Sequence, residues 1–333
     1  TGATPLTPPI PGIQGSGIFS LRNVSDMDRI MVAMDRKKVS SALIVGAGFI
    51  GLEMAENLTE AGLSVTVVEQ APQVMGTVDY SMAVMVHHHL RSKNVELVFN
   101  ETVASFEEKG DRVKVTLQSA RALMADMVIL SMGVKPESRL AKDAGLAVGR
   151  FGGITVNDFL QTSDPSIYAV GDAVEVKNRV TGNPSLIPLA GPANKQARMV
   201  ADNIVKGNKR VYKGSIGTSI AKIFDMSVAS AGASERLLDR EGIAYHTSIS
   251  HAGSNAGYYP GALPLSIKIN FSTEGKLLGA QVVGFAGVDK RIDLLAQVIR
   301  NGGSIYDLQE IEHAYAPPFS SAKDPVNMAG FIA

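Results

Sequence analysis

Residues 42–70 read ALIVGAGFIGLEMAENLTEAGLSVTVVEQ, a stretch that combines an apolar run, a glycine-rich turn, a helical pattern and a second apolar run. In its GxGxxG pattern, Gly46 permits a tight turn, Gly48 lets the backbone approach a pyrophosphate, and Gly51 lets helix and strand pack closely. The start of the helix offers unpaired N–H groups and the positive end of its dipole to phosphates. The stretch therefore predicts a βαβ unit with a dinucleotide site. We expect the cofactor-binding residues of this loop to be Gly46, Gly48, Ile50 and Gly51.

The second apolar run ends at Glu69, 18 positions beyond Gly51. That spacing places a carboxylate where the ribose 2′-OH of a dinucleotide would lie. The negative charge would repel a 2′-phosphate, and neither Gln70 nor Ala71 supplies a cation to receive one. NADH is therefore favoured over NADPH. The alternative is a glycine turn that serves only helix–strand packing in a domain that binds no nucleotide.

The composition argues against several classes of protein. The 333 residues are 45% hydrophobic, which suits two or three domains with cores of their own. Lys+Arg and Asp+Glu both number 32, so the bulk charge indicates no nucleic-acid partner. No apolar run approaches the ~18 residues that span a bilayer, and no secretory signal is visible, so we expect a cytoplasmic protein without membrane contact. Because there is no cysteine, these residues alone form no disulfide, no Cys-ligated zinc site and no catalytic thiol.

The first half of the chain alternates between strand and helix patterns after an irregular Pro- and Gly-rich segment at 1–17. The expected elements are helices at 25–38, 49–61 and 80–93, strands at 42–46, 64–69, 95–99 and 126–133, and a hairpin from 102–107 and 112–118. This alternation predicts a parallel sheet with right-handed crossovers.

Three adjacent histidines, 87–89, fall in the middle of the helix pattern at 80–93. Neighbouring side chains on a helix point about 100° apart, so the three cannot face one metal ion. We expect a solvated or packed helix face and no metal site.

A second unit is expected at 154–206. An apolar strand, Ile167–Val170, precedes Gly171 and Asp172, an arrangement typical of a ligand that lies beyond the carboxyl ends of strands. Asp172 could accept hydrogen bonds from ligand hydroxyls or could cap the next helix, and the spacing leaves both interpretations open. A helix at 190–206 directs its N-terminal dipole beyond Asp172, which would suit the N1–O2 edge of a reduced flavin.

From about residue 211 the pattern changes to strands, Gly-rich turns and one helix at 288–300, which indicates a separate α+β domain. The helix is amphipathic and is expected to cover a sheet. Lys290 and Arg291 at its start could reach a phosphate, or could simply lie on an exposed helix end.

Four segments, in order, resemble the FAD-dependent pyridine nucleotide–disulfide oxidoreductases. TGATP (1–5) is similar to the segment that links their flavin and nicotinamide domains, IVGAGFIGLEMAE (44–56) to the NADH loop, LSMGVKPES (130–138) to the return strand, and IYAVGDA (167–173) to the flavin ribityl motif. The resemblance covers essentially the whole chain. It implies an α/β fold with a Rossmann-like NADH-binding domain (39–153), parts of a flavin domain (1–38 and 154–210), and an α+β dimerisation domain (211–333).

The resemblance also assigns cofactor contacts. By it, Asp172, with Gly171 beside it, would bind the ribityl hydroxyls of FAD, and Leu189 and Ala190 would lie under the isoalloxazine ring. Glu53 would lie near the nicotinamide of NADH. Gly133 would lie beside the bound NADH.

The C-terminal segments NAGYYPGALPL and EHAYAPPFSSAKDPVNMAGF resemble the interface domain of coenzyme A-disulfide reductases and NADH-dependent persulfide reductases. By that resemblance the chain forms a homodimer through this domain. Tyr258 and Tyr315 would be catalytic tyrosines that reach into the partner subunit's active site, with Tyr259 as a competitor for Tyr258. Asn194 and Lys323 would contact coenzyme A. Packing at the interface is the alternative role for the tyrosines.

The chain departs from the family's pattern because the N-terminal flavin-binding part, with its own GxGxxG and active-site cysteine, is not in this sequence. We therefore expect a central fragment that holds half of the FAD site and is inactive by itself. The parent enzyme would pass a hydride from NADH through FAD and a cysteine to coenzyme A disulfide or persulfide. The alternatives are an NADH oxidase or peroxidase of the same architecture, and a flavin-free NADH-binding regulatory module.

Overall fold

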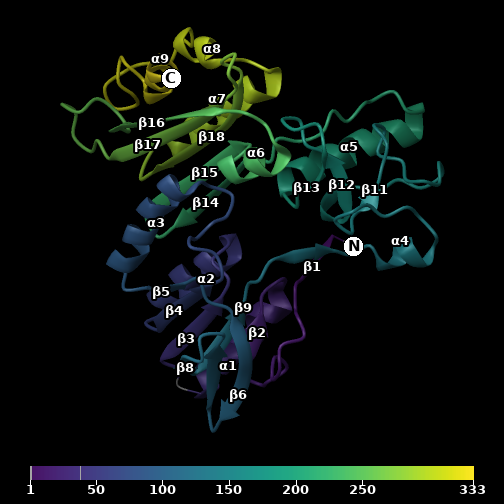
Figure 1. Cartoon of the computed structure of the whole chain (residues 1–333), viewed down its shortest axis with the longest axis vertical. Coiled ribbons are helices and arrows are strands. Elements are labelled where there is room, and N and C mark those ends of the chain that lie inside the picture. Colours follow the sequence, from purple (N-terminus) through teal and green to yellow (C-terminus); the bar gives the residue numbers. More distant parts are fainter. Residues whose placement is uncertain (1, 38) are drawn as a thin grey trace. The chain divides into compact units, whose positions relative to one another are not determined.

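A computed structural model of the chain describes residues 2–37 and 39–333 and divides into two compact units (Figure 1). The N-terminal unit comprises Pro5–Val134 with Ala221–Met226. The C-terminal unit comprises Lys135–Ile220 and Ser227–Ala333, with the first residues up to Thr4. Lys38, the last residue of the first expected helix, lies outside the described residues.

The N-terminal unit is built on a five-stranded parallel sheet of order β2-β9-β3-β4-β5. Its strands are β2 (Ile18–Ser20), β3 (Ser41–Val45), β4 (Ser64–Glu69), β5 (Glu96–Phe99) and β9 (Met127–Leu130), and its helices are α1 (Val24–Lys37), α2 (Phe49–Glu60) and α3 (Tyr80–Ser92). Central strands such as β3 and β9 are almost continuously buried, as parallel strands covered on both faces are. The predicted βαβ sheet is confirmed.

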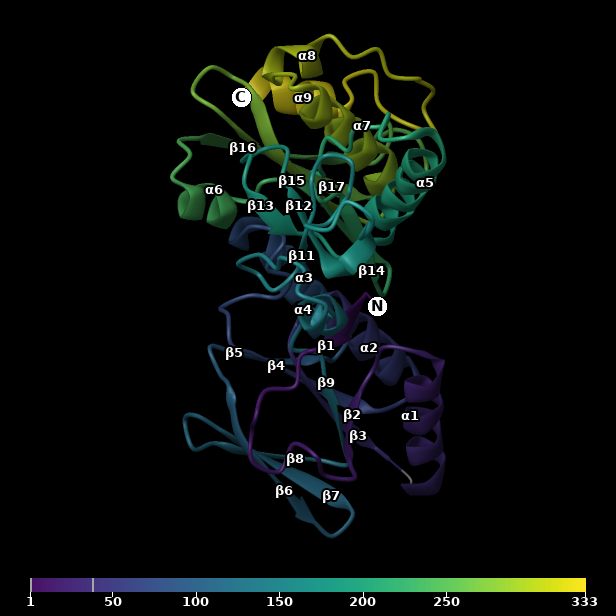
Figure 2. The same cartoon turned by 90° about the vertical axis from the view of Figure 1, so that its right-hand side faces the viewer.

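A second, antiparallel sheet in this unit contains β6 (Val103–Lys109), β7 (Arg112–Leu117) and β8 (Ala122–Ala125) (Figure 2). The predicted hairpin is β6–β7, and β8 was not expected. Val115 and Leu117 of β7 belong to the same apolar core as Leu43 and Val128 of the parallel sheet. The hairpin is thus packed onto the sheet through its apolar positions.

Two of the three histidines of α3 are packed inside the protein and the middle one is exposed. His87 is 4% exposed, its Nε2 accepts a hydrogen bond from Val74 N–H at 3.2 Å, and its ring packs on Phe99 with centroids 4.6 Å apart. His89 is also buried, with Nε2 3.0 Å from Asp225 Oδ1, whereas His88 is exposed. The packed helix face is confirmed for His87 and His89.

The C-terminal unit begins with α4 (Arg139–Asp143) and a three-stranded sheet of β11 (Ile154–Thr155), β12 (Val174–Lys177) and β13 (Pro184–Leu186). A 3₁₀ turn, η1 (Gly171–Ala173), precedes β12, and α5 (Ala190–Lys206) follows β13. The prediction of a strand at Ile167–Val170 is wrong. The segment folds back on its own preceding residues, with Thr162 N–H bonded to Ile167 O and Ala169 N–H to Leu160 O, so it forms only an isolated bridge at Tyr168.

The remaining sheet has five strands in the order β14-β15-β18-β17-β16. They are β14 (Ser219–Ile223), β15 (Met226–Gly232), β16 (His246–Gly253), β17 (Pro264–Phe271) and β18 (Leu277–Gly284), and the pairs β15–β18, β18–β17 and β17–β16 are antiparallel. The amphipathic helix α7 (Val288–Asn301) packs on β18 through Ile292, Leu295 and Ile299, which confirms the expected sheet-covering helix.

The expectation of a single helix after residue 211 is wrong. The described residues also contain α6 (Glu235–Glu241), α8 (Ile305–Gln309) and α9 (Pro325–Ile332), of which α8 and α9 pack on each other (Figure 1). These helices are five to eight residues long, too short to show a helical period in the sequence. The short strands β1 (Ala3–Pro5) and β10 (Val134–Pro136) pair with each other. Across the described ranges, no helix combines the length and the apolar character needed to cross a membrane.

Candidate functional site

The glycine-rich loop between β3 and α2 has the backbone geometry that a pyrophosphate site needs. Gly46 has φ +104°, and a Cβ there would lie 2.2 Å from Ser131 O. A Cβ on Gly51 would lie 2.0 Å from Gly46 O, so both positions exclude larger residues. A Cβ on Gly48 would meet nothing within 4 Å. Gly48 is the N-cap of α2 and no side chain caps this helix end, which leaves its N–H groups open to an anion.

Glu69 lies at the end of β4, where the spacing predicted a carboxylate. Its Oε2 accepts a hydrogen bond from Ala47 N–H and its Oε1 accepts one from Ala71 N–H, both at 2.8 Å. The half-buried carboxylate is therefore fixed beside the glycine loop. A carboxylate has about four acceptor sites, so a ribose hydroxyl can still donate to it.

The other residues predicted to contact NADH lie at the same edge of the parallel sheet. Gly133 follows β9, which pairs with β3, and it has φ +98° with open space around a Cβ position. Ile50 and Glu53 lie in the first turns of α2, and both are exposed. The loops after β3, β4 and β9 thus form one continuous edge, and its donor, acceptor and open positions fit a dinucleotide.

In the C-terminal unit, Gly171 and Asp172 lie in η1, against which α5 packs. Gly171 has φ +80°, and its N–H donates to Oε1 of the buried Gln196 at 2.7 Å. The carboxylate of Asp172 is half-buried and accepts no hydrogen bond from the residues that the structure describes. The helix-capping alternative is wrong, because Asp172 lies within a 3₁₀ turn that leads into β12.

Leu189 is the N-cap of α5 and Ala190 is its first residue, and no side chain caps this end. A half-buried carboxylate without a protein partner, together with an open helix N-terminus, fits the polyol and the electron-rich ring edge of a flavin. Gln196, which holds the Gly171 turn, was missed. Only its place on the inner face of an amphipathic helix could have indicated it.

The two predicted tyrosines meet although 57 positions separate them. Tyr258 lies between β16 and β17, Tyr315 lies between α8 and α9, and their hydroxyl oxygens are 3.0 Å apart. Tyr258 is 77% and Tyr315 is 49% exposed. The hydrogen bond with Tyr258 raises the pKa of Tyr315 above its ordinary value. The competitor Tyr259 does not share this bond and is tied through its backbone N–H to Ala256 O.

Backbone hydrogen bonds join the loops that carry the two tyrosines. Ala256 N–H donates to Ser320 O at 3.0 Å and lies 3.3 Å from Pro317 O. Asn255 Nδ2 also donates to Pro317 O, at 3.3 Å. We call residues 254–263 the first tyrosine loop and residues 310–324 the second tyrosine loop.

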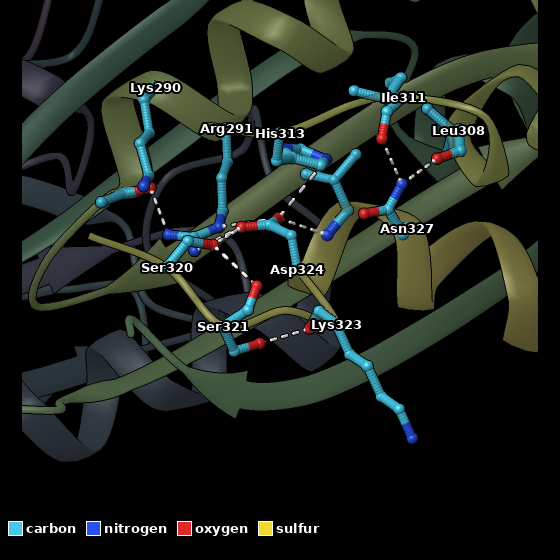
Figure 3. A network of polar contacts seen from close by, with 12 residues as sticks. Lys290, Arg291, Leu308, Ile311, His313, Ser320, Ser321, Lys323, Asp324 and Asn327 are labelled. Atoms are coloured by element: carbon cyan, nitrogen blue, oxygen red, sulfur yellow. Dashed lines mark hydrogen bonds and ion pairs between the residues drawn. The ribbon is translucent and has the colours of Figure 1, made fainter. Parts of the chain in front are cut away.

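A buried ion pair lies under these loops (Figure 3). Arg291 and Asp324 are each 1% exposed, with Nη2 2.8 Å from Oδ2. Burial raises the pKa of Asp324, but hydrogen bonds from Arg291, Ser320 and the N–H of Val326 outweigh it and lower the pKa below its ordinary value. The expectation that Arg291 lies exposed or reaches a phosphate is therefore wrong, because its guanidinium donors are used inside the protein.

Lys323 and Asn194, predicted to contact coenzyme A, are both exposed. The side chain of Lys323 extends away from the Arg291–Asp324 pair (Figure 3), and its backbone oxygen accepts a hydrogen bond from Ser321 Oγ at 2.6 Å. Asn194 lies near the start of α5. Within the described ranges no hydrogen bond or ion pair joins either residue to the tyrosine pair, and no cluster of three or more His, Asp or Glu side chains could hold a metal ion.

Comparison with known proteins identifies the class. Residues 1–197 match the pyridine nucleotide-disulphide oxidoreductase family and residues 218–325 match the dimerisation domain of that family. The chain belongs to this family, with a Rossmann-like fold followed by an α+β dimerisation domain.

Three relatives are close in sequence or structure. The chain is 35% identical to a coenzyme A disulfide reductase of Staphylococcus haemolyticus over 97% of this chain and 72% of the relative, and 35% identical to an NADH oxidase of Methanocaldococcus jannaschii over 99% and 73%. It superposes on the crystal structure of reduced Bacillus anthracis CoADR-RHD with a TM-score of 0.96 and 52% identity. That superposition covers 99% of this chain and 59% of the other, so the chain spans about three fifths of the solved protein.

Proposed function

We propose that these residues serve a flavoprotein reductase that passes a hydride from NADH to coenzyme A disulfide or persulfide. The observation that carries this proposal is the pair of tyrosine hydroxyls 3.0 Å apart in the dimerisation region. It is supported by the similarity to a coenzyme A disulfide reductase and by the dinucleotide edge of the N-terminal unit. When bound, FAD accepts a hydride from NADH and delivers two electrons to a disulfide.

The chain's own residues bind and orient the two cofactors in this proposal. The Gly46–Gly51 loop and the start of α2 hold the pyrophosphate of NADH, and Glu69 accepts from its ribose. Residues 39–153 are thereby assigned to NADH, and 1–38 and 154–210 to FAD. Asp172 holds the ribityl hydroxyls, and the first turn of α5 at Leu189 and Ala190 favours negative charge on the ring edge.

The tyrosine pair supplies a proton to a departing thiolate. One hydroxyl donates to the other, which leaves one O–H free to point at a substrate sulfur. A phenol has an ordinary pKa of about 10, so these hydroxyls are protonated at neutral pH and can donate. Through a homodimer of residues 211–333, the pair would serve the partner subunit's site, with Lys323 and Asn194 contacting coenzyme A. Because the sequence has no cysteine, these 333 residues supply no catalytic thiol.

Turnover of the whole protein tests the substrate. NADH oxidation is followed without oxygen in the presence of coenzyme A disulfide or coenzyme A persulfide, and separately with oxygen as the acceptor. Fast disulfide or persulfide reduction is expected. Fast oxygen consumption without sulfur reduction would instead assign the NADH oxidase activity named for the Methanocaldococcus relative. A visible spectrum without bound flavin would favour the flavin-free regulatory module.

A further inference from the structure

Arg291 is the largest fully buried side chain described, and it lies at the start of α7 beneath both tyrosine loops. Its Nη2 donates to Ser254 O at 3.0 Å, at the beginning of the first tyrosine loop. The same nitrogen donates to Asp324 Oδ2 at 2.8 Å, at the end of the second tyrosine loop. Its Nη1 donates to Gly287 O at 3.0 Å, which fixes the guanidinium to the beginning of its own helix. One planar group thus connects three separate chain segments.

Asp324 completes a closed ring of hydrogen bonds around the two loops. Its Oδ1 accepts from Val326 N–H at 2.9 Å, so the carboxylate also determines where the second loop ends and α9 begins. Ser320 Oγ donates to its Oδ2, and the backbone oxygen of Ser320 accepts from Ala256 N–H at 3.0 Å. Ala256 is two residues from Ser254, whose backbone oxygen accepts from Arg291 and so closes the ring.

The tyrosines depend on this ring because they have little packing of their own. Tyr258 is largely exposed and Tyr315 is about half exposed, so the separation of their hydroxyls depends mainly on where the two loop backbones lie. A single hydrogen bond contributes only about 1 kcal/mol and cannot hold two loops in register. The loops are instead held by the ring below, and by Lys290, whose Nζ donates to Phe319 O.

We propose that Arg291 and Asp324 are positioning residues that keep the hydroxyls of Tyr258 and Tyr315 within hydrogen-bonding distance of each other. The placement stands on the geometry alone, whereas its consequence for proton delivery rests on the proposed function. A buried ion pair is often replaceable by apolar residues without loss of stability, so stability by itself does not require this one. Its role here is to present a rigid fork of donors to two loops, which the point charge of a lysine does not do.

Phenol titration of the chain itself tests the placement, since it needs neither flavin nor turnover. The ultraviolet absorbance of tyrosinate is followed with pH, and the contribution of Tyr315 is isolated by difference from Tyr315→Phe. In a chain that is otherwise unchanged, Tyr258→Phe should remove the upward shift in the pKa of Tyr315. Arg291→Lys should remove the same shift while the folded state persists. Arg300→Lys, on the exposed end of the same helix, is the matched control and should leave the shift intact.

Two further variants keep the test decisive if Arg291→Lys fails to fold. The double variant Arg291→Met/Asp324→Leu leaves no unpaired charge from the buried pair. Ser320→Ala removes the bond from Ser320 Oγ to Asp324, together with the long 3.3 Å bond from the same hydroxyl to Ser321 O. Both variants should show a smaller upward shift in the pKa of Tyr315 than Arg300→Lys does. A Tyr315 titration that stays shifted in the folded variants would overturn the proposal.

Kinetics of the whole protein separate this inference from the proposed function. If both hold, Arg291→Lys should lower kcat for sulfur reduction about 10- to 100-fold, the loss expected from an ~1 Å misplacement, with KM changed much less. If Tyr258→Phe and Tyr315→Phe retain full activity while Arg291→Lys still abolishes the titration shift, the catalytic role fails and the positioning role stands.

Discussion

Gly48 and Gly51 lie three residues apart in one loop, yet an added methyl group would meet opposite surroundings at the two positions. At Gly51 it would lie 2.0 Å from a backbone oxygen, whereas at Gly48 it would meet nothing within 4 Å. We therefore expect Gly51→Ala to lower the free energy of unfolding by about 1–3 kcal/mol, the usual cost of overpacking. Gly48→Ala should leave stability nearly unchanged and weaken NADH binding.

Urea unfolding and NADH titration of both variants check this pair, each serving as the control for the other. Equal NADH affinity in Gly48→Ala and the parent chain would contradict the assignment of the loop to the pyrophosphate. Equal stability of Gly51→Ala and the parent chain would contradict the packing argument.

We propose that Glu69 determines the preference for NADH over NADPH. Its carboxylate is held by the N–H groups of Ala47 and Ala71, in a place where it would repel a 2′-phosphate. Glu69→Arg should shift the ratio of the dissociation constants for NADH and NADPH toward NADPH by tenfold or more, about 1.4 kcal/mol. Glu69→Gln, which keeps an acceptor and removes the charge, should give a smaller shift. An unchanged ratio in both variants would show that the carboxylate does not meet the ribose.

Helix α3 links stability to pH through His87. Burial, with smaller contributions from Arg91 and His88, lowers the pKa of His87 from 6.5 to about 4. Between these values the unfolded chain binds the proton and the folded chain does not, so stability increases with pH in this window. The free energy of unfolding should therefore fall as the pH is lowered from 6.5 toward 4, by roughly 3 kcal/mol at most from this one group.

Urea unfolding over that pH window measures the slope. His87→Gln, which can still accept from Val74 N–H, should flatten the slope even if it lowers stability at neutral pH. His88→Gln changes an exposed neighbour on the same helix and should keep the parent slope. An identical slope in all three proteins would mean that His87 binds protons equally in the folded and unfolded states, which would contradict the lowered pKa.

Elements differed in how well their sequence patterns predicted them. The α2 and α3 helices and the parallel strands β3, β4, β5 and β9 were predicted within a few residues, because their burial leaves a clear apolar pattern. The parallel edge strand β2, only three residues long, was not expected. The prediction of a strand at Ile167–Val170 was wrong, because an apolar run indicates burial but does not indicate that a neighbouring strand is available for pairing. The short helices α6, α8 and α9 are defined by caps such as Ser234, Ser304 and Asp324 rather than by periodicity.

At the scale of the whole molecule, the match to a dimerisation domain and the exposed apolar side chains point to association. Tyr258, Tyr306, Phe319 and Phe331 are each more than 60% exposed in the C-terminal unit. A contiguous patch of exposed apolar side chains is typical of an interface, and these four could contribute to one. We expect a homodimer, and Phe319→Asp should raise its dissociation constant at least tenfold.

Sedimentation equilibrium distinguishes the outcomes. Val24→Asp changes a residue that is 71% exposed in the N-terminal unit and should dimerise like the parent chain. Equal association of Phe319→Asp and the parent chain would place the interface elsewhere. A parent chain that stays monomeric at all concentrations would contradict the dimer.

The parallel βαβ sheet, and the glycine loop with Glu69 at the end of the next strand, could be predicted from the sequence alone. These features depend on residues that are close together in the chain, so their spacing in the sequence determines where they lie in the fold. The pairing of Tyr258 with Tyr315, the bond from Gly171 to Gln196 and the burial of Arg291 were decided only by the tertiary structure. Arg291 shows the reason: as a cation at the start of an amphipathic helix it looks exposed, and only partners 33 and 37 positions away supply the acceptors that allow its burial.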